Sequence, residues 1–364
     1  MNKIKKIMLV VVSIISCSVF ANENQKEEKH VPVVVSFVSN EFYFASKKNI
    51  VANAAIGILG STLYQVNGVQ LSNLMNITHK VNGIQGAGLF NINTNDFAGF
   101  ENAGLFNINA GRFAGIQASG VMNINCGKFY GAQLAGVMNV NAGAIAGFQG
   151  AGVMNIACGE DSYGVQTASV MNIHSGNLNG VQIGLINICS GDCDFQFGLI
   201  NISKNGIAEL ATSYTSNHQF RLAFNSGNQY CYSILGATYN NPFMEEKAID
   251  WRYFANHVTF AGLGTRQTFG ILNLDLEAIF NSAMFVNENN RIKSGNYPSG
   301  RVSAGITPVK HFNIFAGYSA SFEHEWFYNS DLAFKHLKSN WKTAFDNGLT
   351  VHHEIDIGIK FQFN

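Results

Sequence analysis

The chain has 364 residues, and its 23 basic and 23 acidic side chains leave no formal net charge. Only 13% of the residues are charged, against roughly 25% in an average soluble domain, whereas Gly (37) and Phe (29) are abundant. This composition excludes a nucleic-acid-binding protein, because that class needs a basic surface. It favours a β architecture with crowded turns or a lipid-facing surface.

The first 21 residues have the features of an export signal. Three lysines precede an apolar run, Ile7–Ile15, that is too short to cross a bilayer as a helix. We expect cleavage after Ala21, which leaves a polar linker over residues 22–30. In an alternative interpretation, the residues before Cys17 resemble a lipobox, which would place a lipid on Cys17.

Residues 31–66 predict N-terminal strands, and residues 67–206 consist of nine tandem repeats of about 16 residues. Two successive repeats read AGIQASGVMNINCGKF and YGAQLAGVMNVNAGAI. Every repeat has an asparagine after Met, Phe or Ile, and a glutamine precedes it by five or six residues in all repeats but the third, which has Glu101. The shared asparagines are Asn76, Asn91, Asn107, Asn123, Asn139, Asn155, Asn172, Asn187 and Asn201, and the clearest glutamines are Gln117, Gln133 and Gln149.

Two β geometries fit these repeats. A helix is excluded because each interior glycine costs about 1 kcal/mol relative to alanine. Each repeat is either one coil of a β-solenoid, with equivalent residues stacked about 4.8 Å apart, or one strand of a larger barrel. Odd and even repeats look alike, which favours the solenoid, because a barrel alternates strand direction and usually loop length. We expect the repeated amides to form structural ladders rather than a ligand site.

The C-terminal block, residues 207–364, predicts an antiparallel outer-membrane-type β-barrel of about eight strands. Apolar and polar residues alternate along Val351–Phe363 and along Phe312–Phe322. These stretches are longer than an ordinary strand of about 5–6 residues and match the apolar-out, polar-in pattern of membrane strands. Two polar stretches, Asn281–Gly300 and Glu323–Gly348, predict long surface loops.

The repeats resemble a known class of proteins. Units of the form G-V-Q-x-A-G-V-M-N-I, followed by I-G-L-I-N-I and a polar-aromatic strand block, are similar to bacterial surface-repeat proteins of spirochaetes and Bacteroides-type bacteria. The resemblance covers residues 67–203 closely and the remainder loosely. It implies a location in the outer membrane and no known enzymatic activity, and it assigns no functional residue.

The sequence predicts no catalytic, cofactor or metal site. It has no G-x-S-x-G, P-loop or H-E-x-x-H pattern and no CxxC pair. Among the cysteines, Cys189 and Cys193 are the pair best placed for a disulfide, whereas Cys126 and Cys158 lie two repeats apart, beyond the reach of about 7 Å.

We therefore expect a non-enzymatic outer-membrane protein of surface or porin-like character. Its expected partners are outer-membrane lipid and an extracellular ligand or small solute that the sequence does not identify. The alternative is a lipid-anchored or soluble surface adhesin or scaffold, in which the repeats form a binding wall.

Overall fold

The structure is a computed structural model that describes residues 27–38, 48–240, 257–286, 292–337, 341–346 and 348–363. The chain divides into two compact units, Met1–Phe195 and Gln196–Asn364. The expected export signal, Cys17 and most of the polar linker lie outside the described residues. Within those residues, no helix is long and apolar enough to cross a membrane.

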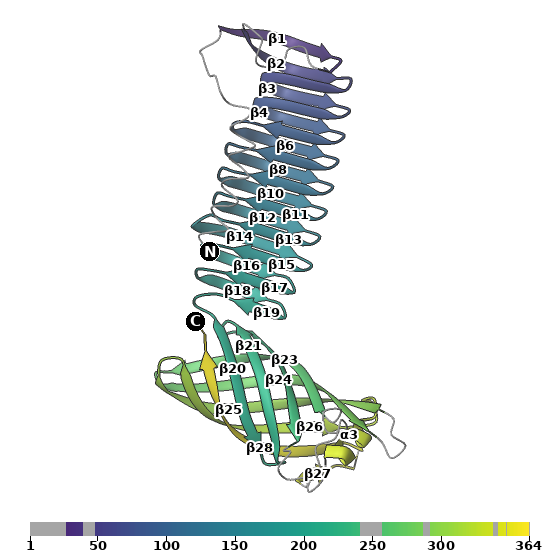
Figure 1. Cartoon of the computed structure of the whole chain (residues 1–364), viewed down its shortest axis with the longest axis vertical. Coiled ribbons are helices and arrows are strands. Elements are labelled where there is room, and N and C mark those ends of the chain that lie inside the picture. The colour runs from purple at the N-terminus through teal and green to yellow at the C-terminus, as the bar shows by residue number, and fades with distance from the viewer. Residues whose placement is uncertain are drawn as a thin grey trace. The chain divides into compact units, whose positions relative to one another are not determined.

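The first unit, with the first residues of the second, is a stack of parallel strands, which Figure 1 shows as successive rungs coloured from purple to teal. The strands form one 19-stranded sheet, in which β1 to β4 are long, and long and short strands alternate from β4 onward. The long strands are β1 (Glu27–Ser36), β2 (Lys48–Gly57), β3 (Gly60–Ser72), β4 (Met75–Ala87), β6 (Phe97–Ala103), β8 (Phe113–Ser119), β10 (Phe129–Ala135), β12 (Ile145–Ala151), β14 (Asp161–Ala168), β16 (Asn177–Ile183) and β18 (Cys193–Phe197). The short strands are β5 (Phe90–Asn93), β7 (Phe106–Asn109), β9 (Met122–Asn125), β11 (Met138–Asn141), β13 (Met154–Ala157), β15 (Met171–His174), β17 (Ile186–Cys189) and β19 (Ile200–Ile202).

The register of this stack places each residue opposite its equivalent in the next repeat. Gln117 pairs with Gln133 between β8 and β10, and Asn123 pairs with Asn139 between β9 and β11, in parallel orientation. Each repeat is therefore one coil, and successive coils are related by translation. The solenoid prediction is confirmed, and the alternative of antiparallel barrel strands is wrong for the repeats.

The stack of parallel strands begins before the recognisable repeats. Ser36 of β1 pairs with Gly57 of β2, and Gly57 pairs with Ser72 of β3. Strands β1 and β2 lack the glutamine of the repeats, and alanine is the most frequent residue of β2. Parallel pairing continues there because the backbone needs no amide ladder to extend a sheet.

The glycine that opens each repeat is required by close backbone contact between coils. Gly115 has φ of +139°, and a Cβ on it would lie 1.8 Å from the carbonyl oxygen of Gly99 in the preceding coil. A side chain there would meet backbone that cannot move without breaking the stack. The same glycine position therefore recurs through the repeats.

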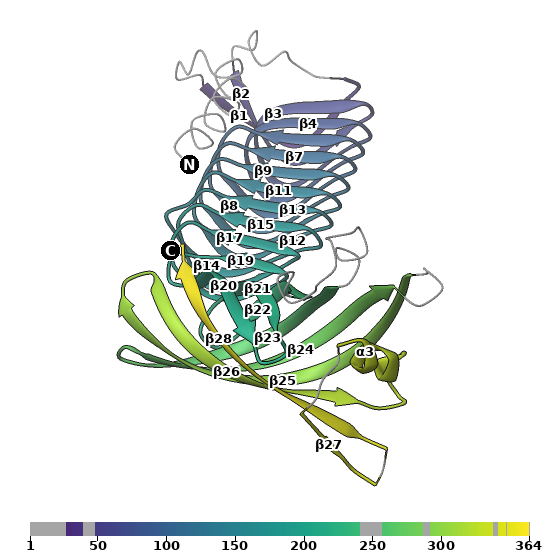
Figure 2. The same cartoon turned by 60° about the horizontal axis from the view of Figure 1, so that its bottom comes forward.

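The second unit contains a closed antiparallel barrel, shown in teal to yellow in Figure 2. Eight strands pair in chain order, and β20 also pairs with β28, which closes the sheet. The strands are β20 (Ile207–Thr215), β21 (Gln219–Gly227), β22 (Tyr232–Asn240), β23 (His257–Phe269), β24 (Leu272–Val286), β25 (Ile292–Val309), β26 (Phe312–Glu323) and β28 (Thr350–Gln362). The remaining elements are helix α3 (Ser330–Leu337) and a short strand, β27 (Lys342–Ala344), that pairs with β28.

Alternation along each strand separates the two faces of the barrel. In β28, Ile357 is 65% exposed on the outside, whereas Asp356 and Lys360 are buried inside. The predicted antiparallel barrel with apolar residues outside and polar residues inside is thus confirmed.

One predicted loop is wrong. Most of Asn281–Gly300 is strand, because β24 continues to Val286 and β25 starts at Ile292. Polar residues hid this continuation, since their side chains face inward and bind one another: Asn281 Nδ2 donates to Ser299 Oγ at 2.8 Å. The second predicted loop contains α3 and β27.

Candidate functional site

The shared asparagines form a buried ladder along the inside of the solenoid. Seven consecutive bonds of 2.9 Å, each from Nδ2 to the Oδ1 of the next coil, join Asn76 to Asn187. The second amide proton goes to a backbone carbonyl, as in the 2.7 Å bond from Asn123 to Leu134 O. Asn201, in the second unit, is also buried, and its Nδ2 donates to Gly198 O. These bonds satisfy the buried amides and give the ladder a structural role.

The glutamines form a second ladder beside the first. Gln133 donates to Gln117 and Gln149 donates to Gln133, both at 2.8 Å. A further set of buried asparagines, which the sequence analysis did not single out, donates sideways into this ladder; Asn125 Nδ2, for example, lies 2.8 Å from Gln117 Oε1. Its members are Asn93, Asn109, Asn125 and Asn141. The solenoid interior is therefore a hydrogen-bonded amide network beside a stack of aromatic rings that includes Phe97, Phe113 and Phe129.

Glu101 occupies a glutamine position in this network. Its carboxyl group is fully buried and accepts bonds from Asn93 and Asn109 at 2.7 Å and from Gln117 at 2.8 Å. The described residues place no cation against it. Burial raises the pKa of Glu101 to about 8, although its three amide donors act in the opposite direction. The group is therefore a buried acid that takes up a proton near neutral pH.

The cysteines provide no disulfide or metal site in the described residues. Cys189 and Cys193 are reduced in the structure and pack with Leu178 in one buried cluster, so the expected bridge between them is not formed. Cys126 and Cys158 are likewise reduced. Across the described ranges, no group of three or more metal-ligating side chains comes together.

A charged network crosses the lumen of the barrel. Arg266 lies between Glu209 and Asp275, with N–O distances of 2.7 and 2.6 Å. Lys360 contacts Asp275 as well and lies 3.9 Å from Glu209. All four side chains are at most 10% exposed, so strands β20, β23, β24 and β28 are joined by buried ion pairs.

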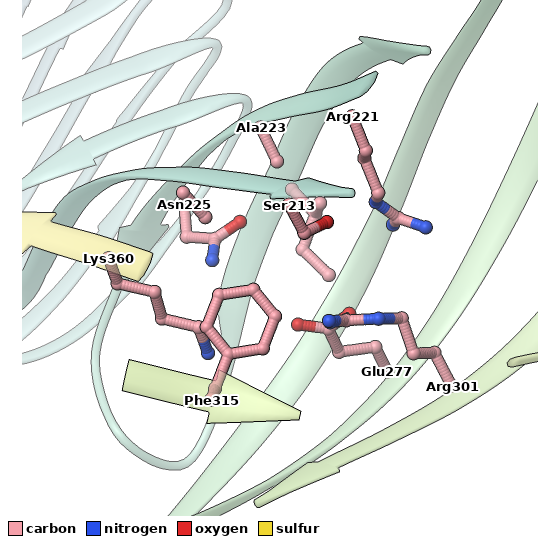
Figure 3. A pocket seen from close by; sticks show the side chains of 10 residues that line it. Ser213, Arg221, Ala223, Asn225, Glu277, Arg301, Phe315 and Lys360 are labelled. Carbon is pink, nitrogen blue, oxygen red and sulfur yellow. The ribbon is translucent and has the colours of Figure 1, made fainter. Parts of the chain in front are cut away.

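A second network lies beside the first. Arg301 donates to Glu277 at 2.7 Å and to Asp356 at 2.8 Å, which connects β24, β25 and β28. Tyr232, which is fully buried, donates to the other oxygen of Glu277 at 3.0 Å. Figure 3 shows Arg221, Glu277 and Arg301 converging on the same space.

The lumen is closed at the level of these networks. The space between Arg221, Phe315, Lys360 and their neighbours has a volume of about 10 Å³, which is room for about one water molecule. Near the strand ends, Phe334 of α3 packs 4.5 Å from the ring of Tyr297, in a buried cluster that includes the inward-facing Phe285. At this level the side chains of the two networks therefore fill the lumen.

Sequence alternation identified the inward face but not these pairs. Arg266 and Glu209 are separated by 57 positions, and they meet because β20 and β23 face each other across the lumen. Single arginines at inward positions of the alternate strands β21, β23 and β25 (Arg221, Arg266 and Arg301) were the available signal, because a buried charge needs a partner.

Comparisons with known proteins find similarity to solved structures. No protein-family model matches the chain, and no curated protein matches it. The crystal structure of neisserial surface protein A is similar with 11% identity and a TM-score of 0.27, over 43% of this chain and 96% of that chain. A de novo designed transmembrane β-barrel is similar with 12% identity and a TM-score of 0.24, over 45% of this chain and all of that chain.

Proposed function

We propose that the protein is a non-catalytic outer-membrane protein whose barrel anchors the β-solenoid and does not conduct solutes. The observation that supports this most is the inversion of polarity in the barrel, with buried ion pairs inside and exposed apolar side chains outside. A soluble protein rarely exposes an apolar patch of more than a few hundred Å², whereas membrane barrels have an apolar outer band.

The outer surface of the barrel has the layered composition of a membrane-spanning barrel. Its middle exposes aliphatic side chains that include Leu222, Leu274, Val302, Ile314 and Ile357. Exposed aromatic side chains lie towards the strand ends, among them Phe269, Phe361, Tyr214 and Phe220. Each of the eight strands has at least 9 residues, and a tilted strand needs about 9–11 to cross the bilayer.

Two measurements test the anchor. Carbonate or urea washing of isolated membranes is expected to leave the protein in the pellet, because the outer band is held in hydrocarbon. Purified protein in a planar bilayer is expected to show no steady ion conductance, because the lumen is filled. Release of folded protein by washing contradicts membrane insertion, and stable open channels contradict the closed lumen.

The lengths of the barrel connections predict which side of the membrane the repeats occupy. At one end of the barrel, the strands are joined by residues 228–231, 270–271 and 310–311. At the other end lie residues 216–218 and 287–291 and the two long connections, 241–256 and 324–349. Membrane barrels of bacteria have short periplasmic turns and longer extracellular loops, so the first end is the periplasmic one.

The chain enters the barrel at this periplasmic end. Ile207, the first residue of β20, pairs with Gly227, which precedes the short turn 228–231. Strand β19 ends at Ile202, so only residues 203–206 separate the last solenoid strand from the barrel. Connectivity therefore favours a periplasmic solenoid rather than repeats displayed on the cell surface.

Epitope insertion tests this orientation. A tag inserted in residues 241–256 is expected to be labelled by antibody on intact cells, whereas a tag between Lys204 and Asn205 is expected to be labelled only after the outer membrane is permeabilised. Cell-surface labelling at the second position contradicts the periplasmic solenoid, while the washing experiment still reports on the anchor.

A further inference from the structure

A trough lies on the outward face of the solenoid, across strands β3, β4, β6, β8 and β10, which follow one another in Figure 1. Its volume is about 380 Å³, within the range of about 300–1,000 Å³ that small-molecule sites have. It belongs to the first unit alone and is separate from the barrel lumen.

Differences between equivalent residues of successive coils produce this trough. One outward row consists, in paired order, of Asn67, Asn82, Ala98, Ala114 and Tyr130. The two alanines leave the surface hollow over β6 and β8, and Tyr130, which is 46% exposed, bounds the hollow at one end. Three strand spacings separate Asn82 from Tyr130, or about 14 Å.

A polar rim borders the alanine floor. It comes from the outward positions two residues earlier in each coil, which hold Gln65, Lys80, Asp96 and Arg112. Arg112 lies 2.8 Å from Asp96 and holds the pKa of that carboxyl below its usual value, so both remain charged. Lys80 is exposed, and no carboxylate in the described parts of the chain lies within ion-pair distance of it. The rim therefore has one positive charge in excess.

We propose that this trough binds a short anionic oligosaccharide. The alanine methyl groups and the Tyr130 ring suit the C–H faces of sugar rings, as apolar walls do in ligand sites. In the Asp96–Arg112 pair, a carboxylate that accepts hydrogen bonds lies beside a guanidinium that donates them, which suits two neighbouring hydroxyl groups of a sugar. The ammonium of Lys80 is the cation that a sugar carboxylate pairs with. The proposal does not depend on the membrane side of the solenoid.

The substitution Ala114→Tyr tests the site without disturbing the coil. Tyrosine already occupies the equivalent outward position at Tyr130 and, two coils further on, at Tyr163. A tyrosine at position 114 fills the floor of the trough and leaves the buried ladders intact. We expect it to lower saccharide affinity at least tenfold with an unchanged melting temperature.

Calorimetric titration of the full chain in detergent provides the measurement. The probes are trigalacturonate, which is anionic, maltotriose, which is neutral, and a triglutamate peptide. Trigalacturonate is expected to bind at least tenfold more tightly than maltotriose, and Lys80→Met is expected to remove this preference. The matched control Tyr163→Ala changes an exposed tyrosine outside the trough and is expected to bind as the unchanged protein does.

Three outcomes overturn the proposal. Absence of trigalacturonate binding rejects the saccharide class, and tighter binding of triglutamate assigns the site to acidic peptides instead. Equal affinity of the Ala114→Tyr variant, with its melting temperature unchanged, places the binding elsewhere on the protein.

Discussion

Replacing Glu101 by glutamine is expected to stabilise the solenoid by about 5 kcal/mol at pH 9 and to have little effect at pH 4.5. The pKa of Glu101 rises from 4.5 to about 8 on burial, and a tenfold change in an acid dissociation constant corresponds to about 1.4 kcal/mol. The pKa of Glu101 is higher in the folded than in the unfolded protein. Its contribution to the free energy of unfolding is therefore fully present below pH 4.5 and is lost as the pH rises to 8. The variant removes this loss.

The hydrogen-bond pattern supports glutamine as the better partner. In the following coil, Gln117 both donates to Glu101 and accepts from Gln133, whereas an ionised Glu101 has no proton to give to Gln85, its neighbour in register. A protonated carboxyl group can supply that donor. The amide oxygens of Asn93 and Asn109 have no partner in the described residues. A flip of either amide would turn its oxygen towards Glu101, where it can accept the proton of the protonated carboxyl group.

Thermal unfolding between pH 4.5 and 9, followed by circular dichroism, measures this difference. The reverse substitution, Gln117→Glu, is the matched control and is expected to add a second loss of stability with rising pH. A Glu101→Gln variant whose melting temperature falls with pH as steeply as that of the unchanged protein contradicts the assignment.

Replacing Arg301 by methionine is expected to destabilise the barrel by about 3–5 kcal/mol. Arg301 is 4% exposed and is the cation between Glu277 and Asp356. Methionine leaves two carboxylates buried without that cation, and breaking a buried pair is costly for this reason. Removing all three charges is much less damaging, because no uncompensated charge remains.

Urea unfolding of the purified protein in detergent measures the loss. The triple variant Glu277→Gln, Arg301→Met and Asp356→Asn is expected to recover most of the stability. Arg112→Met breaks an exposed pair, with the arginine 69% exposed, and is expected to cost less than about 1 kcal/mol. Equal losses in Arg301→Met and in the triple variant contradict the role given to the buried charges.

The solenoid could be predicted because its determinants are local and repeated. A glycine, a glutamine and an asparagine at fixed spacing specify close coil contact and two ladders, and Gly115, Gln117 and Asn123 show all three in one repeat. The trough could not be predicted in the same way, because it depends on positions that differ between repeats. It arises where Ala98 and Ala114 differ from Tyr130, so a comparison of shared positions does not reveal it.

The barrel was predictable in its strands but not in its interior. Period-two alternation marks which residues face inward, as in Asp275 and Glu277. Which carboxylate meets which cation depends on barrel closure, which brings Lys360 of the last strand to Asp275 of β24. The error at Asn281–Gly300 has the same origin, because polar residues that line a barrel resemble a loop when their neighbours across the sheet are unknown.

The translational relation between coils makes the length of the first unit adjustable in whole steps. Loss of residues 115–130 would join the coil of Gly99 to that of Gly131. Each glycine, glutamine and asparagine of the repeat would again pair with its equivalent in the next coil. Each such event, by unequal recombination within the repeated DNA, shortens or lengthens the rod by about 4.8 Å. The length of the solenoid therefore changes in whole coils, and the sequence of the barrel stays the same.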